Sequence, residues 1–179
     1  MVVQNKSKSN SGIRNLITRS NMVMLIMVTT IVLQVTALVL SLTGEGSRAN
    51  IEAIFKGDTA RRFKIATGRI NPGDEKSMYK ASDAQLTEFV IVNLGPIMLF
   101  IVGAVHILNM LLLNHKGLRI LSTLALLVVA SLVCAYLFMT RDNIEEPSKL
   151  QTIPLNVIRA NAIFSLIYSV IQFISLLRP

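Results

Sequence analysis

The sequence predicts an all-α integral membrane protein, a bundle of four transmembrane helices with a long first loop. The 179 residues are 52% hydrophobic with a mean hydropathy of +0.57, which is too apolar for an ordinary soluble domain. The apolar residues form four blocks of about 20 residues or more, enough for a helix to cross a hydrocarbon core of about 30 Å. Because backbone polar groups in lipid must be satisfied within the segment, each block is expected to be a helix. The predicted spans are residues 22–43, 89–113, 118–139 and 157–177.

A single transmembrane domain over residues 22–179 is predicted to follow a basic tail over residues 1–21. The tail is rich in Ser, Asn and Lys, a composition typical of mobile segments. The first apolar run has 22 residues, more than the roughly 7–15 of a signal-peptide core, so we expect a retained membrane anchor. Cys134 is the single cysteine and therefore allows no intrachain disulfide.

Charge indicates lipid contact but leaves the orientation in the membrane open. Four spans place both termini on one side, and that side holds basic residues without acidic ones. The other side holds more Lys and Arg, together with every acidic residue. The count of basic residues favours a cytoplasmic long loop, whereas net charge favours cytoplasmic termini. The overall charge of +8 indicates contact with the bilayer and with anionic lipid head groups at the basic loop, not with nucleic acid.

The long loop of residues 44–88 is predicted to contain two short helices. The stretch 47–56 favours a helix that ends at Gly57. Asp58 is then placed to cap a second helix over residues 59–66. A loop of this length is more than a simple connector, so we expect it to have a function of its own.

The second span combines a helix-start signal with two polar residues deep in the apolar run. Ser82 and Gln85 have the spacing of a capping box at the start of the helix. His106 and Asn109 lie three residues apart and share a helix face, which is expected to face the bundle interior. No metal site is expected, because no other ligand types occur at usable spacing from this histidine.

Polar residues also recur on one face of the first and fourth spans. Thr30 and Gln34 are one helical turn apart and are expected to face another helix. Hydrogen bonds that hold the helices together are the favoured interpretation for all of these polar residues. The fourth span has a polar stripe with steps of four, three, four and three residues, formed by Asn161, Ser165, Tyr168, Gln172 and Ser175.

The basic stretch IFKGDTARRF, residues 54–63, carries a family resemblance. Its Lys-Gly-Asp-x-Ala-Arg-Arg-Phe run resembles a loop motif of microsomal glutathione transferases, a branch of the membrane-associated eicosanoid and glutathione metabolism family. Further along, Lys80, Gln85 and Glu88 are the nearest matches to the motif that enters that family's second helix, and Tyr136 is similar to its tyrosine at the end of the third helix. The motif's histidine is absent, and Lys and Gln replace its Arg and Asn.

The resemblance implies a glutathione-dependent transferase or peroxidase that acts on apolar electrophiles. It implies glutathione as the cofactor, a homo-oligomer in the form of a trimer, and an endoplasmic reticulum or other endomembrane location. Cationic side chains would bind the glutathione carboxylates and lower the pKa of its thiol. No catalytic residue is singled out. The candidate ligand-binding residues are Arg61, Arg62, Lys80, Gln85, Glu88 and Tyr136.

Non-catalytic interpretations remain open beside the enzyme. The basic loop has the composition of an interfacial helix in which Phe55, Phe63 and Ile65 dip into the head groups while arginines meet phosphates. The order of a long first loop and a shorter second one is that of claudin- and peripheral-myelin-like tetraspan proteins, although their Trp and Cys pair are missing. A subunit that assembles into a larger membrane complex is a further alternative. Hydrolase, nucleotide-binding and zinc-protease motifs are absent.

Overall fold

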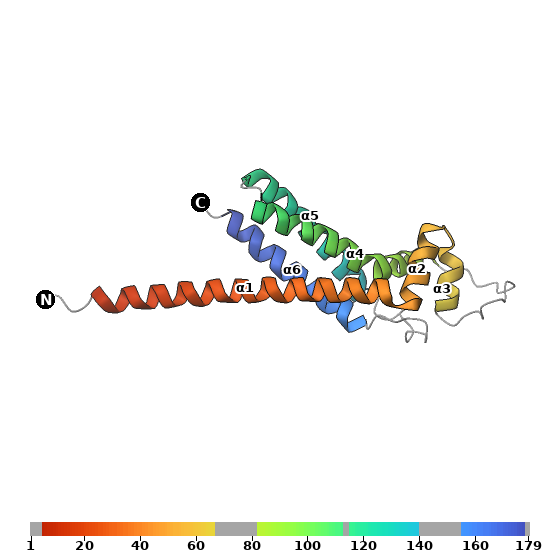
Figure 1. Cartoon of the computed structure of the whole chain (residues 1–179), viewed down its shortest axis with the longest axis horizontal. Helices are drawn as coiled ribbons and strands as arrows, with labels where there is room; N and C mark the ends of the chain where they lie inside the picture. Colours follow the sequence, from red (N-terminus) through yellow and green to blue (C-terminus); the bar gives the residue numbers. More distant parts are fainter. Residues whose placement is uncertain (1–4, 67–81, 113–114, 140–154, 178–179) are drawn as a thin grey trace.

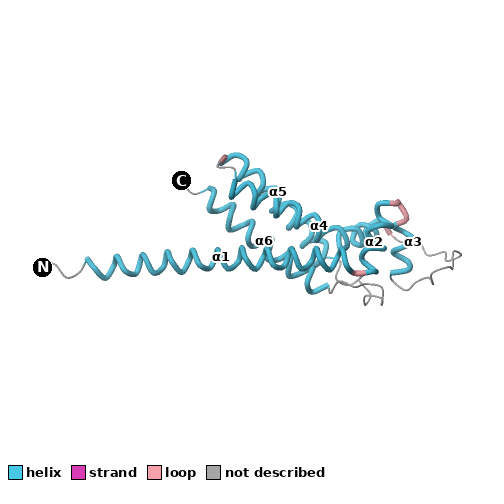
Figure 2. The backbone as a smooth tube through the Cα atoms, in the orientation of Figure 1, coloured by secondary structure: helices cyan, strands magenta, loops and turns pink. Residues whose placement is uncertain are grey.

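The fold consists of helices alone in every part of the chain that the structure describes. A computed structural model describes residues 5–66, 82–112, 115–139 and 155–177. These residues contain six helices and no strand (Figures 1 and 2). The predicted all-α class is therefore confirmed. The helices are α1 (Asn5–Thr43), α2 (Glu45–Phe55), α3 (Thr59–Ala66), α4 (Asp83–Leu112), α5 (Lys116–Met139) and α6 (Leu155–Leu177).

Four of these helices are long and apolar enough to cross a membrane, which makes the chain a multi-pass integral membrane protein. Their apolar segments are Asn21–Thr43, Gln85–Leu112, Lys116–Phe138 and Asn156–Leu177, close to the four predicted spans. The second segment begins earlier than predicted because α4 starts in the polar residues before its apolar run. The four spans form a closed arrangement in which α1 contacts α4 and α6, and α5 contacts the same two helices.

Helix α1 begins well before its apolar segment. A mobile tail is predicted at residues 1–21, but from Asn5 onward the backbone forms one helix with the apolar segment. At 1.5 Å per residue the 39 residues of α1 span about 58 Å, nearly twice the thickness of the hydrocarbon core. Figure 1 shows the first part of α1 projecting alone beyond the other helices, at the end where the C-terminus also lies.

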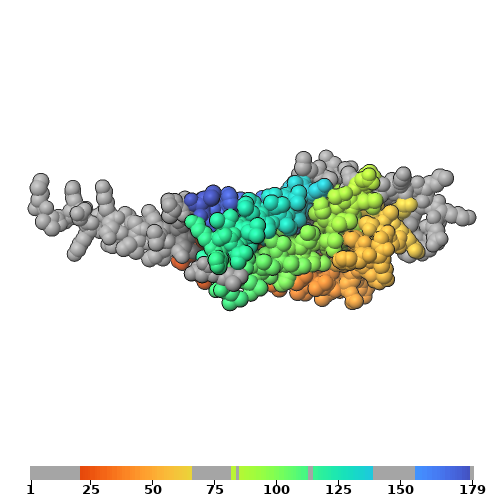
Figure 3. Space-filling view, turned by 90° about the horizontal axis from the view of Figure 1, so that it is seen from above, coloured from red at the N-terminus to blue at the C-terminus, as the bar shows by residue number. Residues whose placement is uncertain are grey.

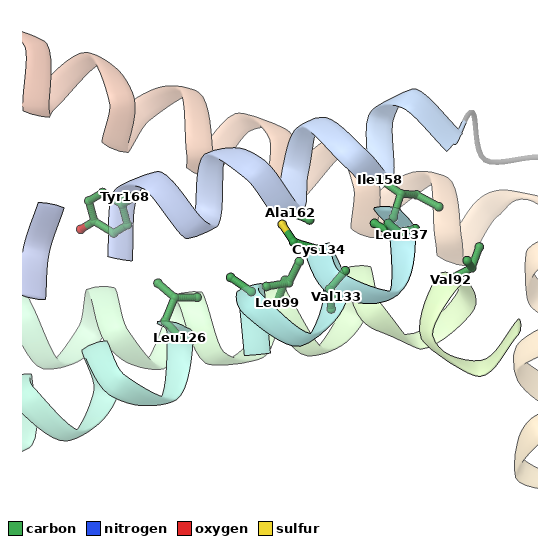
Figure 4. Close-up of a cluster of buried hydrophobic side chains, with 10 residues drawn as sticks. Val92, Leu99, Leu126, Val133, Cys134, Leu137, Ile158, Ala162 and Tyr168 are labelled. Carbon is green, nitrogen blue, oxygen red and sulfur yellow. The ribbon is translucent and has the colours of Figure 1, made fainter. Parts of the chain in front are cut away.

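The apolar core lies where α4, α5 and α6 meet. Leu99, Leu126, Leu137 and Ile158 are almost fully buried there, and Figure 4 shows them with Cys134 between the three helices. The Cys134 thiol is free and buried. Large apolar side chains on the outer faces of the four long helices are exposed, as expected for contact with lipid. Examples on α1 are Met24, Leu25, Val28, Val32, Val35 and Val39.

A glutamine and a glycine set how closely α1 approaches its neighbours. Gln34 is buried, and its Nε2 donates to Ser165 Oγ on α6 at 3.1 Å. The Thr30 hydroxyl, one turn earlier, donates to the Ile26 carbonyl of its own helix at 2.7 Å and lies 3.3 Å from the Phe164 carbonyl of α6, so both residues face another helix as predicted. On α4, a Cβ added to Gly103 would lie 2.7 Å from Gln34 Nε2 and 2.9 Å from its Cδ. The absence of a side chain at Gly103 therefore makes room for the Gln34 amide.

Replacing Gly103 by Ala should destabilise the bundle. The new methyl group would push the Gln34 amide away from Ser165, and overpacking of this kind costs about 1–3 kcal/mol. Unfolding in mixed detergent and SDS micelles would measure the change. Gly117→Ala is the matched control, because nothing lies within 4 Å of a Cβ there. The Gly103→Ala penalty should shrink in a Gln34→Ala background, and an undiminished penalty there would contradict the assigned contact.

Candidate functional site

Helices α2 and α3 form a hairpin at the end of the bundle remote from the two termini. The turn between them is a Schellman motif, in which Gly57 N donates to the Ile54 carbonyl and Asp58 N to the Ala53 carbonyl. Gly57 has a φ of 74°, a left-handed conformation that favours glycine. The two predicted short helices are thereby confirmed, with α2 starting slightly earlier than expected. Figure 1 shows the hairpin running crosswise to the long helices.

The Asn50 side chain ties the hairpin to the bundle. Asn50 is fully buried on α2, and its Nδ2 donates to Asn93 Oδ1 on α4 at 3.1 Å. Its Oδ1 accepts a 2.6 Å hydrogen bond from Arg62 Nε on α3. Asn93 in turn donates to the Phe89 carbonyl of its own helix at 2.7 Å. Three helices thus meet at this one amide, which we call the Asn50 junction (Asn50, Arg62 and Asn93).

An aromatic contact completes the docking of the hairpin. Phe63 on α3 meets Phe89 on α4 edge to face, with ring centroids 5.7 Å apart and both side chains buried. The interpretation that Phe63 dips into lipid head groups is therefore wrong, because its ring packs against the protein. Phe55 at the hairpin tip does point outward and is 78% exposed. Figure 3 shows the hairpin, orange to yellow, seated against α4.

The two adjacent arginines of α3 have different environments. Arg62 is half-buried and donates through Nε to Asn50 and through Nη2 to the Gly46 carbonyl at 3.4 Å. Burial lowers the pKa of the Arg62 guanidinium, which nevertheless stays charged. Arg61 is exposed, and its guanidinium lies 4.0 Å from the Asp58 carboxylate. Consecutive residues of a helix point about 100° apart, so one arginine faces the bundle and the other faces outward.

The remaining candidate ligand residues lie in three different settings. Gln85 forms the predicted capping box: its Oε1 accepts from Ser82 N at 3.1 Å, and its N–H donates to Ser82 Oγ at 3.3 Å. Glu88 is buried in the part of α4 against which the hairpin packs. Tyr136 is half-buried on α5, which among the described helices contacts only α4 and α6. Lys80 lies outside the described residues.

The polar residues of the spans lie mostly inside the bundle. His106, Asn161 and Ser165 are fully buried. Asn109 and Gln172 are half-buried, and Ser175 at the end of the stripe is exposed. Tyr168 is nearly buried. The stripe on α6 therefore points inward over its first three members and reaches the surface toward the C-terminus. These positions suit hydrogen bonds between helices.

Sequence reasoning missed the partnership of Asn50 and Asn93, which are 43 residues apart. The available signal was Asn93, a polar amide within the apolar run of α4. A buried amide needs a hydrogen-bond partner, but its place in the sequence does not say which one.

Replacing Arg62 by Ala should loosen the hairpin, whereas Arg61→Ala should have little effect. The first change leaves Asn50 Oδ1 without its charged donor, a loss of about 1.5–3 kcal/mol. The second breaks an exposed ion pair worth less than about 1 kcal/mol. Hydrogen exchange of residues 45–66 in detergent would separate the two. Arg62→Lys should not restore protection, since Lys lacks the forked donors. Equal exchange in the two alanine variants would contradict the inward role of Arg62.

No family model, curated protein or solved structure matches the chain. The function is therefore inferred from the side chains of the hairpin and of the bundle interior. Arg61 and Arg62 point in different directions on a hairpin that is fixed to the membrane bundle, and this difference is the best guide to the function.

Proposed function

We propose that the protein is a non-catalytic multi-pass membrane protein whose α2–α3 hairpin binds anionic lipid head groups and so organises the surrounding bilayer. The different environments of Arg62 and Arg61 are the main support for this proposal. Arg62 fixes the hairpin to α4 through the Asn50 junction, and Arg61 faces outward. A fixed hairpin presents its outward charges in one arrangement. This favours specific binding of anionic lipid head groups over nonspecific electrostatic attraction to them.

The depth of the hairpin suits this role. The apolar segment of α1 ends at Thr43 and α2 begins at Glu45, so the chain has no room to leave the membrane surface before the hairpin starts. The hairpin then packs against the first turns of α4, at Phe89 and Asn93. These residues belong to the apolar segment that begins at Gln85. The hairpin is therefore expected at the level of the lipid head groups, which flank the hydrocarbon core.

The exposed side chains of the hairpin are of the types that bind lipid phosphates. Arg48, Lys56 and Arg61 are exposed, and so is the Phe55 ring. Cations next to an aromatic side chain are typical of the membrane interface. Lys56 contacts Glu52, and the hydrogen bond and charge of Lys56 lower the pKa of that carboxyl. Exposed pairs of this kind are weak, so lipid phosphates can compete for the cations.

Removing the outward cations should reduce the retention of anionic lipid. Each basic residue near a charged bilayer contributes about 1 kcal/mol, a factor of roughly five in affinity. The test is native mass spectrometry of protein released from nanodiscs that contain phosphatidylserine and phosphatidylcholine. The Arg48→Ala/Lys56→Ala/Arg61→Ala variant should lose the preference for phosphatidylserine, while Lys116→Ala, at the opposite end of the bundle, should keep it. Unchanged preference in the triple variant would overturn the proposal.

A glutathione-dependent transferase is the second candidate, favoured by the position of Glu88. This carboxylate is only 6% exposed, and it lies on the part of α4 that receives the hairpin and its Arg62. A zwitterionic peptide needs a cation for its carboxylates and an anion for its amino group, and this region offers both types of side chain. The expected assembly is then a trimer in an endomembrane.

Glutathione binding to the detergent-purified protein tests this second candidate. Saturable binding and conjugation of an apolar electrophile, both weakened tenfold or more by Glu88→Gln, are expected if Glu88 holds the ligand amino group. The size of the protein in detergent by light scattering would check for a trimer. A folded sample that binds no glutathione at millimolar concentration would exclude the transferase.

A further inference from the structure

Arg159 is a half-buried cation inside a membrane span. It is the fourth residue of the apolar segment Asn156–Leu177 of α6. Its guanidinium carbon lies 6.0 Å from the centre of the Phe138 ring of α5, a distance at which the face of an aromatic ring attracts a cation. The Phe138 ring therefore holds the Arg159 side chain at the seam between α5 and α6.

This pair of side chains lies at the edge of the hydrocarbon core. Phe138 is the last residue of the apolar segment Lys116–Phe138, and Arg159 follows the start of its own segment by three residues, or about 4.5 Å. Figure 4 shows the adjoining residues Leu137 and Ile158 close together in the apolar core. A long cationic side chain at this depth can reach the layer of the lipid phosphates.

The charge of Arg159 has no opposite charge on the two helices that form the seam. Neither α5 nor α6 contains an acidic residue. The Phe138 ring is the contact that the structure records for the guanidinium carbon. A charge within an apolar span needs a partner, and the anion that the bilayer supplies at this depth is a lipid phosphate. The forked donors of an arginine match the oxygens of a phosphate.

An apolar stripe continues from Arg159 along the outer face of α6. Its members follow Arg159 at steps of four, four, three and four residues, which keeps them on one face of the helix. They are between 36% and 47% exposed, and the face opposite them contains the buried Asn161 and Ser165. The stripe consists of Ile163, Ile167, Val170 and Ile174. Together with Arg159 it places a positive charge at one end of a hydrocarbon surface, which complements the phosphate and acyl chain of a phospholipid.

We propose that the seam between α5 and α6 binds one phospholipid with a net negative charge. Its phosphate lies at Arg159, and one of its acyl chains lies along the stripe; we call this the seam site (Arg159, Phe138 and the stripe). The occupant is a lipid and not a free phosphate ion, because the stripe needs an apolar partner. Among the described helices, α2 and α3 contact α1 and α4 but neither α5 nor α6, so the seam site does not depend on lipid binding by the hairpin.

Quenching of a single tryptophan by brominated lipids tests the seam site in the full-length protein. The chain contains no Trp, so Ile163→Trp places the one reporter a helical turn from Arg159. Val32→Trp, on the exposed face of α1, is the matched control. Each variant is reconstituted in mixtures of phosphatidylcholine and phosphatidylserine, in which one of the two lipids has brominated chains. The reporter at Ile163 should show a roughly fivefold preference for phosphatidylserine, the gain expected from one basic residue, and the reporter at Val32 should show none.

Substitutions at the seam identify the source of the preference. In the Ile163→Trp background, Arg159→Gln should abolish the preference, and Arg159→Lys should keep only part of it, because lysine has the charge without the forked donors. Phe138→Leu should reduce it, because the guanidinium is then no longer held by the ring. Equal quenching by the two lipids at Ile163→Trp, or a preference that survives Arg159→Gln, would overturn the proposal.

The hairpin variant separates the seam site from the proposed function. Arg48→Ala/Lys56→Ala/Arg61→Ala should leave the preference at Ile163→Trp unchanged, even though it is expected to lower the total retention of phosphatidylserine. Loss of the local preference in this variant would assign it to the hairpin and contradict the seam site. An Ile163→Trp reporter that neither brominated lipid quenches would contradict the contact between the stripe and lipid.

Discussion

The hydrogen bonds of the Asn50 amide are the interaction on which the arrangement of the hairpin depends. One side chain uses its carbonyl for Arg62 and its amide NH2 group for Asn93, and so joins α2, α3 and α4. The Phe63–Phe89 contact adds apolar burial between α3 and α4. Because Arg62 is held inward, the neighbouring Arg61 must face outward.

Buried polar groups need hydrogen-bond partners, and this constraint also determines how the helices pack inside the bundle. Gln34 reaches Ser165 because Gly103 leaves space for its amide. The Thr123 hydroxyl bonds to the Arg119 carbonyl of its own helix, and the Ser122 hydroxyl joins α5 to His106 on α4. Each of these contacts joins two different helices or fixes the geometry of a contact that joins them. Apolar side chains fill the remaining space but provide little orientation, since lipid and core are equally apolar.

The spans and the hairpin helices could be predicted from sequence because their causes are local. Bilayer thickness sets the length of an apolar run, Gly57 ends α2, and Ser82 with Gln85 starts α4. The site could not be predicted in the same way. Phe63 at the apolar face of α3 suits a helix on lipid as well as one docked on protein, and only the position of Phe89 decides between them. Which of two adjacent arginines turns inward depends equally on Asn50, a distant residue.

The Asn50 junction also constrains any ligand at the hairpin. A carboxylate is bound most strongly by the forked donors of an arginine, but Arg62 already uses Nε for Asn50 and Nη2 for the Gly46 carbonyl. A ligand that took both donors would leave Asn50 Oδ1 unpaired in a buried position, at a cost of about 1–3 kcal/mol. Tight carboxylate binding by Arg62 would therefore have to release the hairpin from α4. Arg61 makes only an exposed contact with Asp58 among the described residues, so the proposed binding of lipid phosphates at the outward face would leave the junction intact.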